Sequence, residues 1–167
     1  MEWRRQPNPV SDKYPFLLIS GRVVYHFHTR TKTARAKPLN DRAPHAYVEI
    51  HPQDAERLGI EMGDLVAITS PQGRMEVVAM VVDTVREGEL FTPFHYGHGA
   101  QAANQHTWYA RDPVSHQPQL KSCPVAVRWL SFGRPEPWLL ERLKDLNGES
   151  LEPFAARAFD GTVNRTQ

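Results

Sequence analysis

The stretch richest in residues that can do chemistry is Phe91–Thr107, which reads FTPFHYGHGAQAANQHT. Its aromatic rings, three histidines and one asparagine offer flat apolar faces and hydrogen-bonding edges close together. Pro93 stiffens the start of the segment, while Gly97 and Gly99 permit close backbone approach or positive φ. None of these residues forms a nucleophile–base pair. The pattern therefore indicates a loop that binds a flat, polar ligand.

The eight histidines raise the question of a metal site. Zinc ligands have spacings such as two histidines on one helical face, whereas His26 and His28 have strand spacing and His95 and His98 lie in a loop. A zinc site is therefore the less favoured interpretation, and no metal ligand is assigned. Polar contacts to a ligand are predicted for His26, His28 and His95. Structural or exposed positions are predicted for the others considered, which are His45, His51, His106 and His116.

Composition narrows the class of protein. The 167 residues are 40% apolar, so one domain with tails is expected. Lys and Arg total 20 against 19 acidic residues, which gives no broad basic field for nucleic acid. The single cysteine, Cys123, excludes a disulfide framework and a cysteine-rich zinc or iron–sulfur site within this chain. Any anion site must be local.

The sequence has no apolar run near the ~20 residues needed to cross a bilayer. The first ten residues, MEWRRQPNPV, lack the apolar core of a secretion signal. We therefore expect a cytoplasmic protein without a membrane span, unless a partner carries it elsewhere.

Six short β runs at close spacing, with one small helix between two of them, indicate a mainly β protein of the barrel type. The runs cover residues 16–20, 47–50, 65–70, 74–82, 89–94 and 124–130. The helix is predicted to begin near Pro52 and to stop at Gly59. The segment His28–Asn40 has neither helical nor strand periodicity and is predicted to be a long functional or mobile loop.

The predicted domain organisation has three parts: an arm at residues 1–14, a barrel at residues 15–130 and a helical tail at residues 131–167. An amphipathic helix is predicted over Glu136–Asn147, with Trp138, Leu139, Leu143 and Leu146 near one face. Periodicity leaves open whether this helix packs on its own barrel or on another chain.

Four blocks in order carry a family resemblance. They read GRVVYHFHTRTKT, YVEIHPQDAERLGIEMGDLVAITSPQGRMEV, GELFTPFHYGHGAQAANQHT and RDPVSHQPQLKSCPVAV. This order resembles the carboxyl-terminal molybdopterin-dinucleotide-binding domain of molybdenum and tungsten oxidoreductases, which include formate dehydrogenases and nitrate reductases. The resemblance covers about two thirds of the chain, from Pro15 to Arg128. It implies a double-psi β-barrel fold.

The resemblance also implies a cofactor, molybdopterin guanine dinucleotide, whose pyrophosphate needs cations or N–H donors. Arg22, Arg30, Lys32, the nearby threonines and the backbone near Gly21 are candidates for that role. The family pattern predicts ten cofactor-binding residues in two polar loops and before the last strand. They are Gly21, Arg22, His26, His28, Thr29, Thr31, Phe94, His95, Asn104 and Lys121.

Each of these assignments has a simpler alternative. A basic run such as Arg30–Lys37 is ordinarily a solvated face, and Asn104 is also suited to capping a helix or turn. Cys123 stands at the start of an apolar strand, where cysteine behaves as a small buried hydrophobe, and the family takes its metal ligand from another domain. No catalytic residue is assigned.

The chain departs from the family in residues and in length. Many relatives carry glycine and methionine in the first loop, where this chain has Arg30 and Lys32, and a residue other than Leu120 before the lysine. Relatives are several times longer, and their other domains bring the iron–sulfur cluster and the protein ligand to the metal. The chain is therefore expected to be a separately encoded small subunit or an excised domain.

Two functions follow from different classes of protein. In the first, the chain is the cofactor-binding part of a molybdenum or tungsten oxidoreductase, and a larger catalytic polypeptide holds the metal ligand. In the second, it is a stand-alone barrel for cofactor delivery or protein interaction, without a redox role. Substrate and choice of metal stay open in both.

Overall fold

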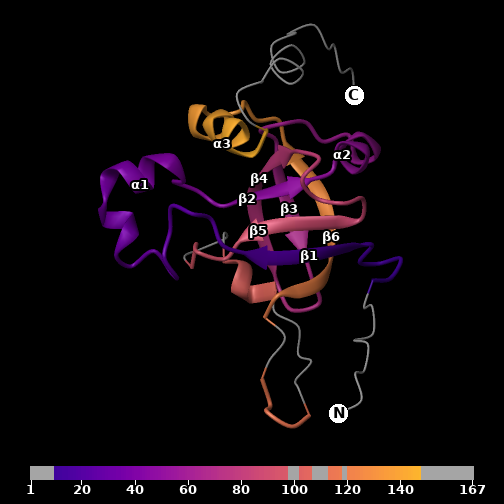
Figure 1. The fold of residues 1–167 in the computed structure, drawn as a ribbon. Coiled ribbons are helices and arrows are strands. Elements are labelled where there is room, and N and C mark those ends of the chain that lie inside the picture. The colour runs from indigo at the N-terminus through magenta and orange to yellow at the C-terminus, as the bar shows by residue number, and fades with distance from the viewer. Residues whose placement is uncertain (1–9, 98–101, 107–112, 118–119, 148–167) are drawn as a thin grey trace, which may run out of the picture.

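The computed structural model describes residues 10–97, 102–106, 113–117 and 120–147 (Figure 1). Within this part, six strands close into a barrel in the order β1-β5-β2-β4-β3-β6. Their bounds are β1 Phe16–Gly21, β2 Tyr47–Ile50, β3 Leu65–Thr69, β4 Arg74–Val81, β5 Glu89–Pro93 and β6 Ser122–Ser131. Each of the six predicted β runs overlaps one of these strands, and no bound differs by more than two residues.

Strand direction identifies the type of barrel. β1 runs parallel to β5 and β2 parallel to β4, whereas the other four neighbouring pairs are antiparallel. Parallel neighbours need long crossover connections, and here the β2–β4 connection carries α2 (Pro52–Leu58) and β3. The mainly β fold with two crossed parallel pairs is the predicted double-psi β-barrel, and that prediction is confirmed.

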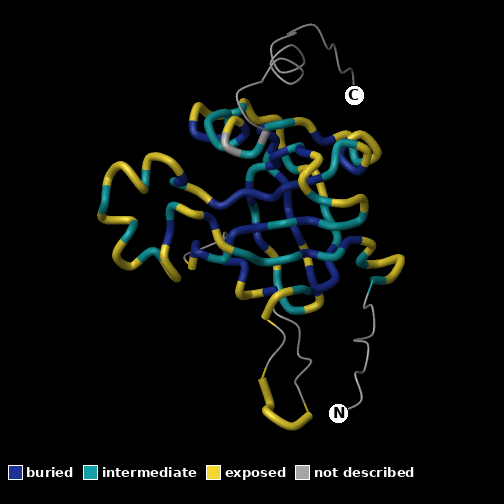
Figure 2. The backbone as a smooth tube through the Cα atoms, viewed as in Figure 1, coloured by how far each residue is buried: buried dark blue, intermediate teal, exposed yellow. Residues whose placement is uncertain are grey.

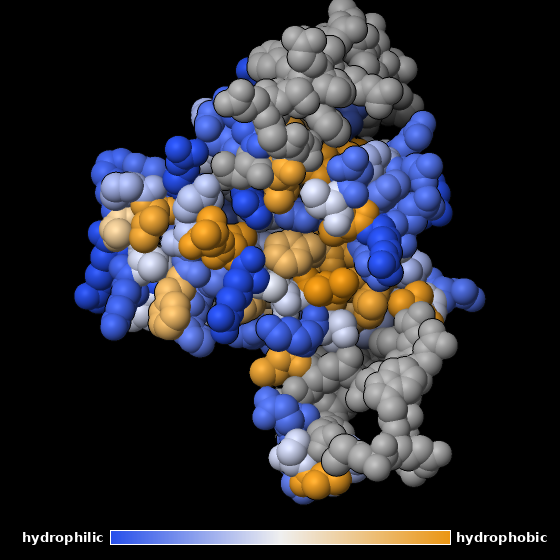
Figure 3. Space-filling model, in the orientation of Figure 1, coloured by the Kyte–Doolittle hydropathy of each residue, from blue (hydrophilic) through white to orange (hydrophobic). Residues whose placement is uncertain are grey.

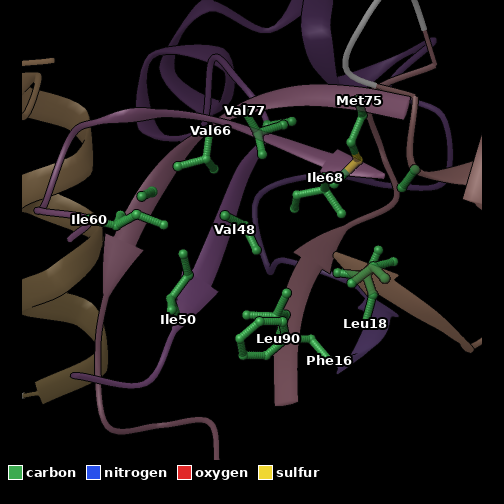
Figure 4. Packing of buried hydrophobic residues seen from close by; sticks show 14 of the residues in the cluster. Phe16, Leu18, Val48, Ile50, Ile60, Val66, Ile68, Met75, Val77 and Leu90 are labelled. Carbon is green, nitrogen blue, oxygen red and sulfur yellow. The ribbon is translucent and has the colours of Figure 1, made fainter. Parts of the chain in front are cut away.

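The inside of the barrel is apolar because alternate residues of each strand point inward. Figure 4 shows side chains from five strands meeting there, among them Val48, Val66, Val77 and Leu90. All four residues of β2 are buried, which alternation alone does not explain. The outward face of β2 must therefore be covered by another element.

That element is α3 (Pro137–Asn147), the helix predicted over residues 136–147. Leu139 and Leu143 are fully buried in a second cluster with Tyr47 and Met80 from the barrel, which settles where the helix packs. The Arg142 Nε–H donates to the Tyr47 hydroxyl over 3.1 Å. Figure 1 shows α3 beside the ends of β2 and β4.

The prediction of a loop over residues 28–40 was wrong in part, because this segment contains helical turns. η1 spans Thr33–Arg35 and α1 spans Lys37–Arg42. Pro38 lies in the first turn of α1, where its missing N–H is tolerated, so it begins a helix instead of ending a loop. In Figure 2 the segment that holds η1 and α1 is mostly exposed. Because neither helix buries a residue, the sequence has no periodic apolar pattern that could have revealed them.

The short helix between β2 and β3 agrees with the prediction. α2 starts at Pro52 and is stopped by Gly59, whose φ of 64° suits glycine. η3 spans Ala103–His106 in the second polar segment. No helix among the described residues is both long and apolar enough to span a bilayer. Residues 1–9 of the predicted arm (residues 1–14) and the part of the predicted tail (residues 131–167) beyond residue 147 lie outside the described residues.

Candidate functional site

Strand register brings the two polar loops to one end of the barrel. Because β1 and β5 are parallel neighbours, Gly21 pairs with Pro93, and the loops that follow both strands leave from the same edge. β6 runs antiparallel to β1, so its first residue, Ser122, pairs with Ile19 near that edge. We call residues 22–40 the first loop and residues 94–106, of which 94–97 and 102–106 are described, the second loop. The segment before β6 joins them at this corner.

Three predicted residues meet there around one aromatic ring. The Arg22 guanidinium carbon lies 5.8 Å from the centroid of the Phe94 ring, and the Lys121 ammonium lies 5.5 Å from the same centroid. Both cations are exposed, and Phe94 is half-buried. Two cations held beside a ring form a local positive site, which suits an anion with several oxygen atoms.

His95 ties the second loop to the first. Its ring is completely buried; Nε2 accepts the Val23 backbone N–H over 2.9 Å, and Nδ1 lies 2.5 Å from the His28 carbonyl oxygen. A carbonyl oxygen only accepts, so Nδ1 carries the proton and donates it. Burial lowers the pKa of His95, which keeps the ring neutral. Both nitrogens are used inside the chain, so His95 positions the first loop.

His26 is held in the same way from the other side of the first loop. Its Nε2–H donates to the Ala43 carbonyl over 2.6 Å, and its Nδ1 accepts from the Thr33 hydroxyl over 3.0 Å. The side chain is buried, and burial lowers its pKa. Tyr96 also donates to the Ala43 carbonyl, over 2.8 Å. In this structure His26 and His95 are therefore internal connectors, and the cofactor contacts predicted for them stay predictions.

His28, Thr29 and Thr31 lie exposed on the first loop. His28 has φ of 43° and Arg30 has φ of 65°, which places two residues with side chains in the left-handed region. Arg30 is held there because its guanidinium lies 4.4 Å from the Tyr96 ring centroid and donates to the Asn40 side chain over 2.5 Å. The loop therefore presents its polar groups in a backbone conformation that buried contacts maintain.

The absence of a side chain at Gly21 allows an aromatic ring of the same chain to approach closely. A Cβ built at Gly21 would lie 2.3 Å from Cε2 of Phe91. The described chain thus fills the space beside Gly21 with one of its own rings. The Gly21 carbonyl accepts the Phe94 backbone N–H over 3.1 Å, which fixes Phe94 next to the end of β1.

Asn104 is exposed and lies on η3. Its neighbours Ala103 and His106 line a shallow hollow together with Ser20 and Lys121. Asn104 thus lies at the same corner as Lys121. His28 is linked to this corner through its carbonyl oxygen, which accepts the hydrogen bond from His95. Sequence reasoning missed Tyr96 and Ser20 as parts of this site, because Ser20 is placed there by strand register and Tyr96 by its contacts with Arg30 and the Ala43 carbonyl.

Cys123 lines the same hollow, and its prediction as a buried hydrophobe is confirmed. Burial raises the pKa of its thiol to about 12, so the reactive thiolate is scarce at neutral pH. Among the described residues, no three His, Cys, Asp or Glu side chains are grouped to hold a metal ion.

Similarity to solved structures supports the fold. A chain of acetylene hydratase from Pelobacter acetylenicus superimposes with a TM-score of 0.61 at 18% sequence identity. The match covers 69% of this chain and 18% of that one. At this identity the likeness shows the fold alone, a barrel that forms a small part of a much larger polypeptide.

Sequence comparison identifies the family. The model described as the molybdopterin dinucleotide-binding domain matches residues 16–124. The alpha subunit of F420-dependent formate dehydrogenase 1 from Methanococcus maripaludis is 37% identical over 122 residues, which are 72% of this chain and 18% of that subunit. Periplasmic nitrate reductase from Desulfovibrio desulfuricans is 39% identical over 116 residues, which are 70% of this chain and 15% of the enzyme.

The site and fold thus define a cofactor-binding barrel of the kind found in formate dehydrogenases and nitrate reductases. The chain belongs to the molybdopterin dinucleotide-binding domain family. The predicted family and the predicted cofactor, molybdopterin guanine dinucleotide, are confirmed at this level. The chain spans less than a fifth of the length of these relatives.

Proposed function

We propose that the chain holds molybdopterin guanine dinucleotide for an oxidoreductase of the formate dehydrogenase or nitrate reductase type. The larger part of that enzyme, as a separate polypeptide or as further domains, supplies the protein ligand to the metal and the iron–sulfur cluster. The short span of the chain relative to its relatives supports this division. We place this function in the cytoplasm, as the sequence predicts.

The observation that carries the proposal is the convergence of Arg22 and Lys121 on the Phe94 ring. The two cations lie 99 positions apart in the sequence, and they reach the same ring because β1 pairs with both β5 and β6. The charge and donor count of this pair fit the pyrophosphate group of a dinucleotide. Both are exposed, so a bound anion reaches them without unfolding a loop.

The remaining predicted residues divide into two roles. We propose that Arg22, Lys121, Phe94, His28, Thr29, Thr31 and Asn104 contact the cofactor. His26 and His95 position the first loop from beneath, and Gly21 lets Phe91 pack against the end of β1. When bound, the cofactor supplies two-electron chemistry at its metal, while this chain binds it, orients it and excludes water.

The test is cofactor retention by Arg22→Ala and Asn104→Ala chains reconstituted with molybdopterin guanine dinucleotide. Each loss of a hydrogen-bonded charge or amide is expected to weaken binding about 10-fold or more. Thermal stability should change by no more than ~1 kcal/mol, because both side chains are exposed. Arg35→Ala, also exposed in a helical turn of the first loop, is the matched control.

Unchanged retention in both variants would contradict the site. The chain alone is expected to be redox-silent even when loaded, since the larger partner provides the metal ligand and cluster. Turnover of formate or nitrate by the isolated chain would contradict the division of labour proposed here.

A further inference from the structure

His106 is a buried histidine at the rim of the cationic corner that the sequence predicted only as structural or exposed. It ends η3 and is 1% exposed. Its Nδ1 lies 3.0 Å from the Ser70 hydroxyl oxygen, in the turn between β3 and β4. This contact fixes the orientation of the ring relative to the barrel.

The hydrogen bonds of Ser70 define the tautomer of His106. The Ser70 hydroxyl oxygen accepts the backbone N–H groups of Gln72 and Gly73, each over 3.1 Å. With its two lone pairs used, the hydroxyl has only its proton to offer, and Nδ1 of His106 at 3.0 Å is a nearer acceptor than the Gly73 carbonyl oxygen at 3.4 Å. Nδ1 is thus unprotonated, and in the neutral ring the proton resides on Nε2.

The Nε2–H donor of His106 has no hydrogen-bond partner among the described residues. A buried donor left unsatisfied costs about 1–3 kcal/mol, so an acceptor that reached it would be bound favourably. A buried donor without a hydrogen-bond partner is uncommon in folded proteins and needs an explanation, and a bound ligand atom that accepts its hydrogen bond is one such explanation.

His106 lines the hollow between β1, η3 and the start of β6, together with Ser20, Ser122 and Lys121. The hollow is open to solvent and has room for about one water-sized group. The hollow therefore suits one group of a larger ligand. The Lys121 ammonium makes an anionic oxygen the best match.

We propose that this hollow is a subsite for a phosphate-type oxygen of the dinucleotide, with the His106 Nε2–H as donor and Lys121 as cation. The inference rests on the proposed function and adds His106 to its site. Nε2 itself is covered in this conformation, so the oxygen enters as the rim shifts. Leu120, 46% exposed, is the rim side chain with most room to move.

The experiment is a titration of the full-length, ¹⁵N-labelled chain with inorganic pyrophosphate, followed by long-range NMR of the imidazole nitrogens. Before addition, His106 is expected to show the Nε2–H tautomer. Pyrophosphate should shift the Nε2 resonance and raise the pKa of His106 from about 4, because a nearby anion stabilises the imidazolium. His45, which is exposed and lies beside Trp138 of α3, is the internal reference.

Two variants separate binding from structure. His106→Leu removes the donor at similar volume and is expected to weaken pyrophosphate binding about 10-fold or more, whereas His106→Gln keeps an N–H donor and retains most of it. Equal affinity of His106→Leu and the parent chain would overturn the proposal, whatever its stability.

The outcomes also separate this proposal from the function on which it rests. Shifts at the Arg22 and Lys121 side chains with an unchanged His106 would overturn the subsite and leave the cofactor site standing. No shift at any of the three at saturating pyrophosphate would contradict both. A neutral pterin that moves His106 when pyrophosphate does not would overturn the assignment to an anionic oxygen.

Discussion

The buried histidines and the exposed cations of the corner show two ways in which polar residues enter one site. His26 and His95 use every ring nitrogen inside the chain, to Thr33, Ala43, Val23 and His28. Arg22 and Lys121 lie exposed beside Phe94 and keep their charged ends toward solvent. In Figure 3 the lobe that holds α1 presents mostly hydrophilic side chains, with a few hydrophobic ones among them. Residue type alone does not separate scaffold from ligand contact; burial and internal pairing do.

The largest effect is expected from His95→Ala. The substitution leaves the buried Val23 N–H and His28 carbonyl without partners and opens a cavity, which should lower the free energy of unfolding by about 2–4 kcal/mol. Urea unfolding measures this loss. His45→Ala, at an exposed histidine, should change stability by less than ~0.5 kcal/mol. Equal losses in the two variants would erase the distinction between connector and surface histidines.

Gly21→Ala should follow with a loss of about 1–3 kcal/mol. The new methyl group would collide with the Phe91 ring, which must move away from the end of β1. Gly97→Ala is the matched control, because a Cβ there meets nothing within 4 Å and its φ is not positive. Thermal unfolding of both variants tests the point, and a stable Gly21→Ala chain would show that the corner tolerates crowding.

Acidification should destabilise the chain through its buried histidines. Burial lowers the pKa values of His26 and His95, and lowers that of His106 to about 4, so the unfolded chain binds more protons below its pKa of about 6.5. Their contribution is complete above pH ~6.5 and is lost as the pH falls, for His106 down to about pH 4.

Glu49 acts in the opposite direction, because burial raises its pKa. The histidine effect is therefore isolated by comparison with His106→Leu, whose stability should fall less steeply between pH 6.5 and 4 in denaturant titrations. Identical slopes of stability against pH for the two chains would show that His106 does not contribute to the acid destabilisation.

The smallest effects are expected from Thr29→Val and Thr31→Val. Their hydroxyl groups lie 3.1 Å apart on the exposed loop, so stability should change by less than ~0.5 kcal/mol. Calorimetric titration with the cofactor should show a loss of about 5-fold for each if they donate to it. Unaltered binding in both would move them from the ligand-facing group to the solvated surface.

The sequence was sufficient for the fold because the strand signals are local. Most β runs are short apolar stretches with Gly, Pro or Asp at one or both ends, and Gly88 stands at positive φ just before β5. The helical turns of α1 were missed because they bury no residue and so leave no periodic pattern.

The site was harder to predict because its assembly is not local. Lys121 and Arg22 were each named by the family pattern, yet only the pairing of β1 with β5 and β6 brings them to one ring. The histidines were predicted as ligand contacts from their chemistry, and no sequence signal marks Ala43 or Val23 as their internal partners. His106 was passed over for the same reason, since Ser70 is 36 positions away.

The central claim is that Arg22 and Lys121 grip the same anionic group of the cofactor. A double-mutant cycle of Arg22→Gln, Lys121→Gln and the double variant, with calorimetric affinities for molybdopterin guanine dinucleotide, tests it most directly. The account predicts a loss of about 10-fold or more in each single variant and a double loss that differs from their product by about 2-fold or more. Full affinity in the double variant would contradict it.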